Sequence, residues 1–198
     1  MLVGAEDLVA RARVLSHHGI NGDAWKRYGE RGSWFYEVSA PGFKYNMSDV
    51  QAALGLVQLS RLGGFQARRR AIVKQYQEAF SGRDDLRLPV ERPDVRSSWH
   101  LYPIRTTGQA SLGRDQVISE LGRMNIGTSV HFIPIHLQPY YRDRYGFDPS
   151  DFPVAQSAFE HLISLPLHPG LSDEDVADVV EAVDTVMTGG GDEPAILT

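Results

Sequence analysis

Tyr45 and Asn46 lie just before a predicted helix start in the stretch Gly42–Gln58, which reads GFKYNMSDVQAALGLVQ. Ser48 is a favoured N-cap residue, because its hydroxyl can accept a hydrogen bond from an unpaired amide of the first helical turn. Asn46 comes two residues earlier, where a helix start presents free backbone donors. Such a position suits an anion, above all phosphate. Many loop-to-helix junctions share this pattern and bind nothing, so the pattern alone favours a junction without a ligand.

Histidine is the other residue type that could do chemistry, with seven copies in the chain. His131 and His136 lie five residues apart across Pro134, but no HExxH pattern is present and no carboxylate stands at ligand spacing beside them. We therefore expect no metal site. The chain also lacks the GxSxG, GxGxxG and Walker A patterns, although a Ser-His-Asp arrangement stays open. Residue types alone name no enzyme class.

Composition narrows the class of protein. The 198 residues are 42% hydrophobic and 23% charged, which is typical of a globular domain. A net charge of -5 favours neither nucleic acid nor an anionic membrane as a partner. The absence of cysteine excludes disulfides and a cysteine nucleophile. No apolar run approaches the ~20 residues of a membrane helix, and no signal peptide is recognisable, so we expect a cytoplasmic protein.

The first part of the chain is predicted to form two helices separated by a loop. Residues 1–3 have the character of a strand, and residues 5–17 form a short amphipathic helix that ends near Gly19. Residues 21–41 are rich in glycine, charge and aromatic side chains without a clear period, as in a loop that packs on something. A continuous apolar stripe then predicts one long helix from Ser48 to about Phe80.

The second part alternates between strands and helices. Strands are predicted at 86–88, 98–105, 128–132 and 163–165, and helices at 111–124, from 151 onward, and at 172–187. Ser111 is expected to cap the first of these helices, and Ser172 forms a capping box with Asp175. Residues 134–145 are expected to be irregular, and the tail is rich in glycine. One sheet with covering helices, a small α/β domain, is the predicted fold.

Several segments, in order, resemble the C-terminal half of the DegT/DnrJ/StrS-type sugar aminotransferases, which are pyridoxal-phosphate (PLP) enzymes of fold type I. The segments are RARVLSHHGI, GFKYNMSDVQAALGLVQLSRL, FQARRRAIVKQYQEAF, SWHLYPIR, MNIGTSVHFIPIHLQPYYRDRYG and ISLPLHPGLSDEDVADVVEAV. The resemblance runs from Met1 to about Met187. It implies a remnant of the large cofactor domain with an aromatic active-site loop at 1–47, a connecting helix at 48–81, a small C-terminal α/β domain at 82–188 and a disordered tail at 189–198.

The resemblance also implies roles for three residues. Asn46 matches an asparagine that reaches the cofactor phosphate of the neighbouring subunit, in agreement with the anion-receptive helix start. Tyr45 matches the segment that borders the partner's active site, where substrate binds. His131 matches a position near the sugar-nucleotide pocket, and a structural histidine that caps a strand end is an equal alternative. No residue of this chain is expected to be catalytic.

The lysine that forms the Schiff base with PLP is missing from the resemblance. Lys26, Lys44 and Lys74 all lie outside the lysine motif of the family, so the chain is expected to be inactive alone. The whole protein is then expected to transfer an amino group, from glutamate, to a keto sugar on a nucleotide, as a homodimer. Two alternatives remain: part of a PMP-dependent sugar dehydratase of the same family, or a non-catalytic interaction module.

Overall fold

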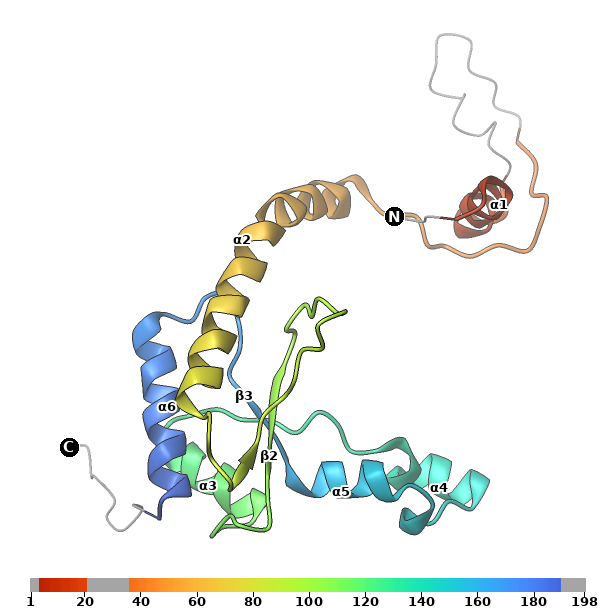
Figure 1. Cartoon of the computed structure of the whole chain (residues 1–198). Helices are drawn as coiled ribbons and strands as arrows, with labels where there is room; N and C mark the ends of the chain where they lie inside the picture. Colours follow the sequence, from red (N-terminus) through yellow and green to blue (C-terminus); the bar gives the residue numbers. More distant parts are fainter. Residues whose placement is uncertain (1–3, 21–35, 190–198) are drawn as a thin grey trace. The chain divides into compact units, whose positions relative to one another are not determined.

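The protein is described by a computed structural model that covers residues 4–20 and 36–189 (Figure 1). The chain divides into two compact units, Met1–Ser60 and Arg61–Thr198, and one long helix runs from the first into the second. The predictions of a strand at residues 1–3 and of a disordered tail, and most of the predicted loop at 21–41, lie outside the described residues. No helix of the described ranges is long and apolar enough to cross a membrane.

Two helices, α1 (Glu6–Ser16) and α2 (Asp49–Ala79), confirm the first two predicted helices to within one residue at each end. In α2 the 31 residues form a single helix. Its second half is amphipathic, with Ile72, Val73 and Tyr76 buried. Its first half instead carries large apolar side chains on several faces, and these are exposed: Val50, Leu54, Leu56, Val57, Leu59 and Leu62. A helix that is apolar on several sides is normally buried, whereas the described residues leave this half of α2 exposed.

The sheet has three antiparallel strands in the order β1 (Leu86–Arg87), β2 (Tyr102–Thr106) and β3 (Leu162–Leu165). In β2 the side chains alternate between fully and partly buried. Tyr102 lies opposite Leu165 and Ile104 opposite Ile163, and all four are buried on the same face. The register therefore gives the sheet a core face and a second, more open face.

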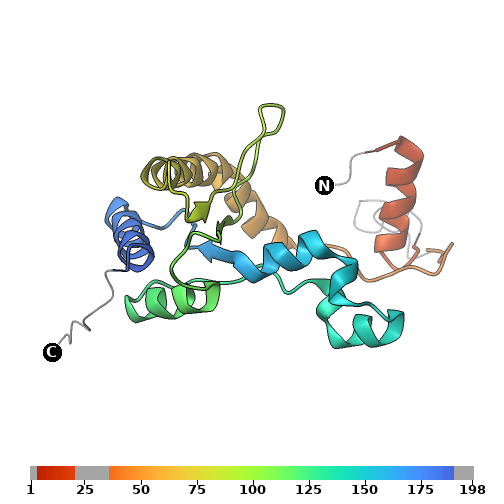
Figure 2. The same cartoon turned by 60° about the horizontal axis from the view of Figure 1, so that its bottom comes forward.

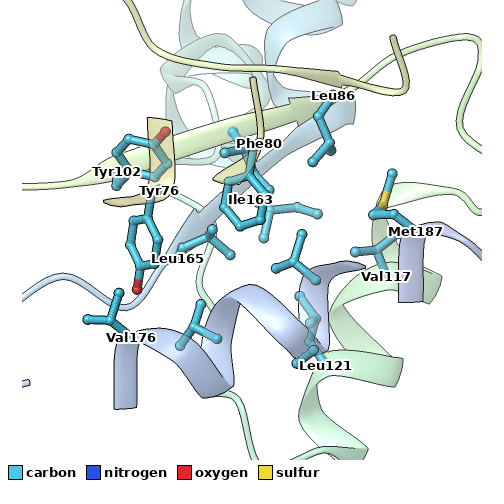
Figure 3. Packing of buried hydrophobic residues seen from close by; sticks show 14 of the residues in the cluster. Tyr76, Phe80, Leu86, Tyr102, Val117, Leu121, Ile163, Leu165, Val176 and Met187 are labelled. Atoms are coloured by element: carbon cyan, nitrogen blue, oxygen red, sulfur yellow. The ribbon is translucent and has the colours of Figure 1, made fainter. Parts of the chain in front are cut away.

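Two helices, α3 (Arg114–Arg123) and α6 (Asp173–Met187), cover the core face together with the second half of α2. Figure 3 shows their apolar side chains, Val117 and Leu121 from α3 and Val176 and Met187 from α6, pointing toward the strands. The capping box predicted for α6 is confirmed. Ser172 Oγ accepts from the Asp175 amide at 3.0 Å, and an Asp175 carboxylate oxygen accepts from the Ser172 amide at 2.7 Å.

Short helices fill the segment between α3 and β3: η2 (Ile135–Leu137), α4 (Pro139–Tyr145), η3 (Pro149–Asp151) and α5 (Pro153–His161). Figure 2 shows α5 leading directly into β3. Residues 134–145, predicted to be irregular, thus contain two helices. Pro139 and Pro153 open their helices, where a missing amide hydrogen costs nothing.

Three further boundaries differ from the sequence prediction. Residues 128–132 form no strand but only one bridge, between Ser129 and Ser164. The strand predicted from residue 98 begins at Tyr102, because Trp99 has a positive φ of 46° that no strand accommodates. The helix predicted from Ser111 begins at Arg114, where the Gln116 side chain accepts from the Gly113 amide at 3.0 Å.

An arginine fork ties the start of the sheet to α6. Arg83 donates to both carboxylate oxygens of Asp85, at 2.9 and 2.7 Å, and to Asp184 at 2.6 Å. The Arg83 and Asp85 side chains are each 17% exposed, so water screens the pair only in part. The hydrogen bonds from Arg83 lower the pKa of Asp85 below its ordinary value of 3.8.

We expect Asp85→Asn to lower the free energy of unfolding at neutral pH by about 1–2 kcal/mol, because it removes a partly buried charged hydrogen-bond partner. The folded-state pKa lies below the ordinary value, so the stabilisation is present above pH 3.8 and is lost as the pH falls below it. Urea unfolding at several pH values measures this. Asp94→Asn, in an exposed pair with Arg92, is the control and should change nothing; equal effects of both variants would contradict the account.

We also expect these 198 residues, produced by themselves, to associate. The exposed apolar side chains of the first half of α2 are contiguous, and contiguous apolar surface drives association. Leu54→Lys with Leu59→Glu should shift the chain toward monomer in light scattering. Val90→Lys removes an even more exposed apolar side chain outside α2 and should have no effect. A monomeric unmodified chain would contradict the prediction.

Candidate functional site

The loop that carries Tyr45 and Asn46 is held by backbone hydrogen bonds to the end of α1. The Phe43 amide donates to the Leu15 carbonyl at 2.7 Å, and the Tyr45 amide donates to the Ser16 carbonyl at 2.8 Å. In the other direction the His18 amide donates to the Phe43 carbonyl at 2.9 Å. These bonds fix residues 43–45 as an extended segment beside the last turn of α1. The positions of Tyr45 and Asn46 are therefore set by the backbone.

Two glycines permit the close approach of the two segments. Gly19 has a φ of +74°, and a Cβ built on it would lie 1.7 Å from the Ala40 carbonyl oxygen. A Cβ on Gly42 would lie 2.0 Å from the Gly19 amide nitrogen. Both distances are far below van der Waals contact, so no other residue type fits either position without moving the backbone. From the sequence, Gly19 was predicted only to end the first helix, and no role was predicted for Gly42.

Tyr45 and Asn46 both face solvent in the described part of the chain. The Tyr45 side chain is 72% exposed, and its ring stacks on Phe43 with 5.1 Å between ring centroids and 4° between the planes. The side-chain amide of Asn46 is exposed and has no hydrogen-bond partner among the described residues. Both predicted residues are therefore accessible at the surface of the described residues.

The start of α2 confirms Ser48 as the N-cap and adds a partner. Ser48 Oγ accepts from the Gln51 amide at 3.4 Å, and Gln51 Oε1 accepts from the Ser48 amide at 2.9 Å. This reciprocal box leaves the amides of Asp49 and Val50 without an acceptor in the described structure. Two free backbone donors and the Asn46 amide fit a phosphate, although the Asp49 carboxylate in the same turn opposes an anion.

His131 belongs to the second unit. Its Nδ1 lies 3.0 Å from the Ser164 Oγ, and its ring meets Phe132 edge-on with centroids 4.8 Å apart. His131 lines an apolar pocket of about 550 Å³ together with side chains of the segment from η2 to α5, among them His136, Phe152 and Phe159. His136 is 6% exposed and stacks on Phe152, and its Nε2 has no hydrogen-bond partner in the described ranges. Sequence reasoning missed Ser164, because nothing in the sequence pairs it with a residue 33 positions away.

The described residues contain no group of three or more histidine, aspartate or glutamate side chains that could hold a metal ion. The two described lysines have ordinary surroundings. Lys44 lies exposed in the loop that is hydrogen-bonded to the end of α1. The Lys74 Nζ lies 3.7 Å from the Glu78 carboxylate, one turn further along α2. Lys26 lies outside the described residues. Neither described lysine has the buried, low-dielectric setting that would make it a nucleophile.

A family model of aminotransferases, described as DegT/DnrJ/EryC1/StrS, matches residues 1–184. The chain belongs to this family. The match covers more than nine-tenths of the sequence, including the loop of Tyr45 and Asn46 and the segment of His131. The family assignment made from the six segments is therefore confirmed.

Curated relatives match this chain over about half of their own length. The spore coat polysaccharide biosynthesis protein SpsC of Bacillus subtilis is 47% identical over 186 residues, which cover 93% of this chain and 48% of the relative. The uncharacterized protein MJ1066 of Methanocaldococcus jannaschii is 44% identical over 184 residues, with 92% and 48% covered. The chain thus corresponds to one portion of these longer proteins.

Solved structures of sugar aminotransferases have a similar fold in the matching portion. The putative sugar aminotransferase Spr1654 from Streptococcus pneumoniae, in its PMP form, superposes with a TM-score of 0.82 at 37% identity over 94% of this chain and 46% of that protein. Its PLP form gives a TM-score of 0.80 at 35% identity. The predicted fold class is confirmed: the chain has the α/β fold of the C-terminal half of PLP-dependent sugar aminotransferases.

We expect Gly42→Ala to displace the loop of Asn46 and to destabilise the first unit by about 1–3 kcal/mol, because its Cβ would collide with the backbone of Gly19. Hydrogen exchange of the Phe43 and Tyr45 amides measures this directly, and both should exchange faster. Gly55→Ala is the control: it lies in open space within α2 and should raise stability by up to about 1 kcal/mol. Unchanged protection of the two amides in Gly42→Ala would show that the crossing is not tight.

Proposed function

We propose that this chain is the C-terminal portion of a PLP-dependent nucleotide-sugar aminotransferase that transfers an amino group, from glutamate, to a keto sugar carried on a nucleotide. The observation that carries the proposal is the loop bonded to α1: its Asn46 side-chain amide and the amides of Asp49 and Val50 just after it have no partner among the described residues. That arrangement supports binding of a phosphate group. Membership of the aminotransferase family makes the PLP phosphate the natural ligand.

In this proposal Asn46 donates a hydrogen bond from its side-chain amide to the PLP phosphate of a neighbouring subunit, and the amides of Asp49 and Val50 add backbone donors. Tyr45 lines the edge of the neighbour's substrate pocket with the ring that stacks on Phe43. The exposure of both side chains is what a contribution to another subunit requires. The protein would then act as a homodimer.

His131 would contact the sugar nucleotide. Its Nδ1 is engaged with Ser164, so its Nε2 is the ring atom left to meet a substrate hydroxyl. PLP, when bound, supplies an electron-poor ring that holds negative charge at the reacting carbon. None of Lys26, Lys44 and Lys74 matches the lysine motif of the family, so in this proposal the cofactor lysine comes from residues outside this chain. We also propose the division of the chain into a remnant of the large domain up to residue 47, a connecting helix up to 81 and a small domain up to 188.

Reassembly with an upstream half tests the proposal. We would co-express this chain with the upstream portion of a relative such as Spr1654 and follow the loss of PLP absorbance on adding glutamate. Asn46→Ala should weaken PLP retention about tenfold, the effect of one charged hydrogen bond. Asn46→Asp should weaken it further, because its carboxylate repels the phosphate.

Unfolding temperatures of the two variants provide the control, because Asn46 has no partner in the described structure and its replacement should leave the fold intact. Equal PLP retention by all three proteins would remove Asn46 from the phosphate site. If the wild-type assembly forms but exchanges no amino group with glutamate or with any keto sugar nucleotide, the interaction-module alternative takes the place of the proposal. Loss of a sugar hydroxyl without net amino transfer would favour the dehydratase alternative.

A further inference from the structure

Two arginines face each other across the edge of the sheet. The register of β1 and β2 places Arg87 opposite Arg105, next to the pair of Leu86 and Thr106. Leu86 and Thr106 are buried on the core face, so the two arginines project from the other face, where directly opposed side chains have Cβ atoms roughly 5 Å apart. Like charges at this spacing repel each other and destabilise the strand pair.

Nothing in the described structure compensates these two charges. Neither Arg87 nor Arg105 has a hydrogen bond, an ion pair or an aromatic contact with any described residue. Several other arginines of the second unit are engaged, among them Arg68 with Asp173, Arg70 with Glu91, and Arg83 with Asp85. Arg105 is moreover partly buried, which makes an uncompensated charge costly. The pair thus has the charge and the free donors of an anion site.

The same face of the sheet carries the hydrogen bond of His131. Arg105 lies opposite Leu162, and Ser164, two residues further along β3, projects from the same face as Leu162. The Ser164 hydroxyl contacts His131, and Leu162 and His131 both line the 550 Å³ pocket. The arginine pair therefore stands on the face that also bears the candidate sugar contact, with Arg105 one strand and Arg87 two strands away from the pocket wall.

We propose that Arg87 and Arg105 form a subsite for a diphosphate, the group that links sugar and nucleoside in the substrate. Two guanidinium groups on neighbouring strands supply parallel donors to the several oxygens of a diphosphate, which a single arginine cannot span. Binding of the anion also removes the repulsion between the two cations. The identification of the diphosphate with that of a nucleotide-linked sugar rests on the proposed function, whereas the anion site itself rests on the register and the unpaired charges.

The test uses the 198-residue chain and inorganic pyrophosphate as the probe, with inorganic phosphate and sulfate at equal ionic strength as the other arms. Thermal unfolding should show that pyrophosphate stabilises the wild-type chain more than either smaller anion. Arg87→Gln and Arg105→Gln should each weaken pyrophosphate binding about tenfold. Without an anion, Arg87→Gln should unfold at the same or a higher temperature than wild type, because it relieves the repulsion.

Arg123→Gln is the matched control. It removes the same charge from α3, on the opposite side of the sheet, where Arg123 pairs with Glu120, and should bind pyrophosphate like wild type. Equal stabilisation by all three anions, or unchanged pyrophosphate binding in both arginine variants, would overturn the proposal. In a reassembled active enzyme Arg105→Gln should raise KM for the sugar nucleotide about tenfold and leave kcat unchanged. The pyrophosphate measurement does not depend on catalysis, so it stands even if the proposed function fails.

Discussion

The contact of Tyr76 with the sheet is the interaction on which the arrangement of the second unit depends. The Tyr76 ring lies 5.1 Å from that of Tyr102 in β2 and 5.9 Å from that of Phe80, and its hydroxyl donates to the Pro166 carbonyl at 2.9 Å. One side chain thus joins α2 to the central strand and to the segment after β3. Burial raises the pKa of the Tyr76 hydroxyl, which therefore stays a proton donor at every ordinary pH.

The two halves of α2 meet different demands. The second half completes a hydrophobic core within the chain, whereas the first half presents apolar side chains that the described residues leave exposed. The helix start at Ser48 follows directly on the loop pinned to α1. The exposed apolar side chains of the first half, next to Asn46, fit the proposal that another portion of the protein or another subunit covers them.

Helix caps could be predicted from the sequence, whereas the pairing of segments that are distant in the sequence could not. The Ser172–Asp175 box and the Ser48 cap were predicted correctly because each depends on residues three apart. The strand expected at 128–132 was wrong because a strand requires a neighbouring edge, and only Ser129 meets β3 there. The early start expected for β2 was wrong because an apolar alternation cannot reveal the positive φ of Trp99.

Some residues of the candidate sites could be predicted from the sequence and others could not. Asn46 and Tyr45 stand out in the sequence, because a helix cap and a family motif mark them. The partnership of His131 with Ser164 and the opposition of Arg87 and Arg105 depend on strand register, which short strands of two to five residues specify weakly. Gly42 matters because the backbone of Gly19 lies where a Cβ would be, and a glycine in the sequence does not show which segment approaches it.

We propose that this chain supplies Asn46 to a PLP phosphate held mainly by residues outside it. A crystal structure of the chain assembled with a PLP-containing upstream half would show this contact. We expect the Asn46 side-chain nitrogen within hydrogen-bond distance, about 3 Å, of a phosphate oxygen bound to the neighbouring subunit. A structure in which PLP is bound and the Asn46 amide still faces solvent would contradict it.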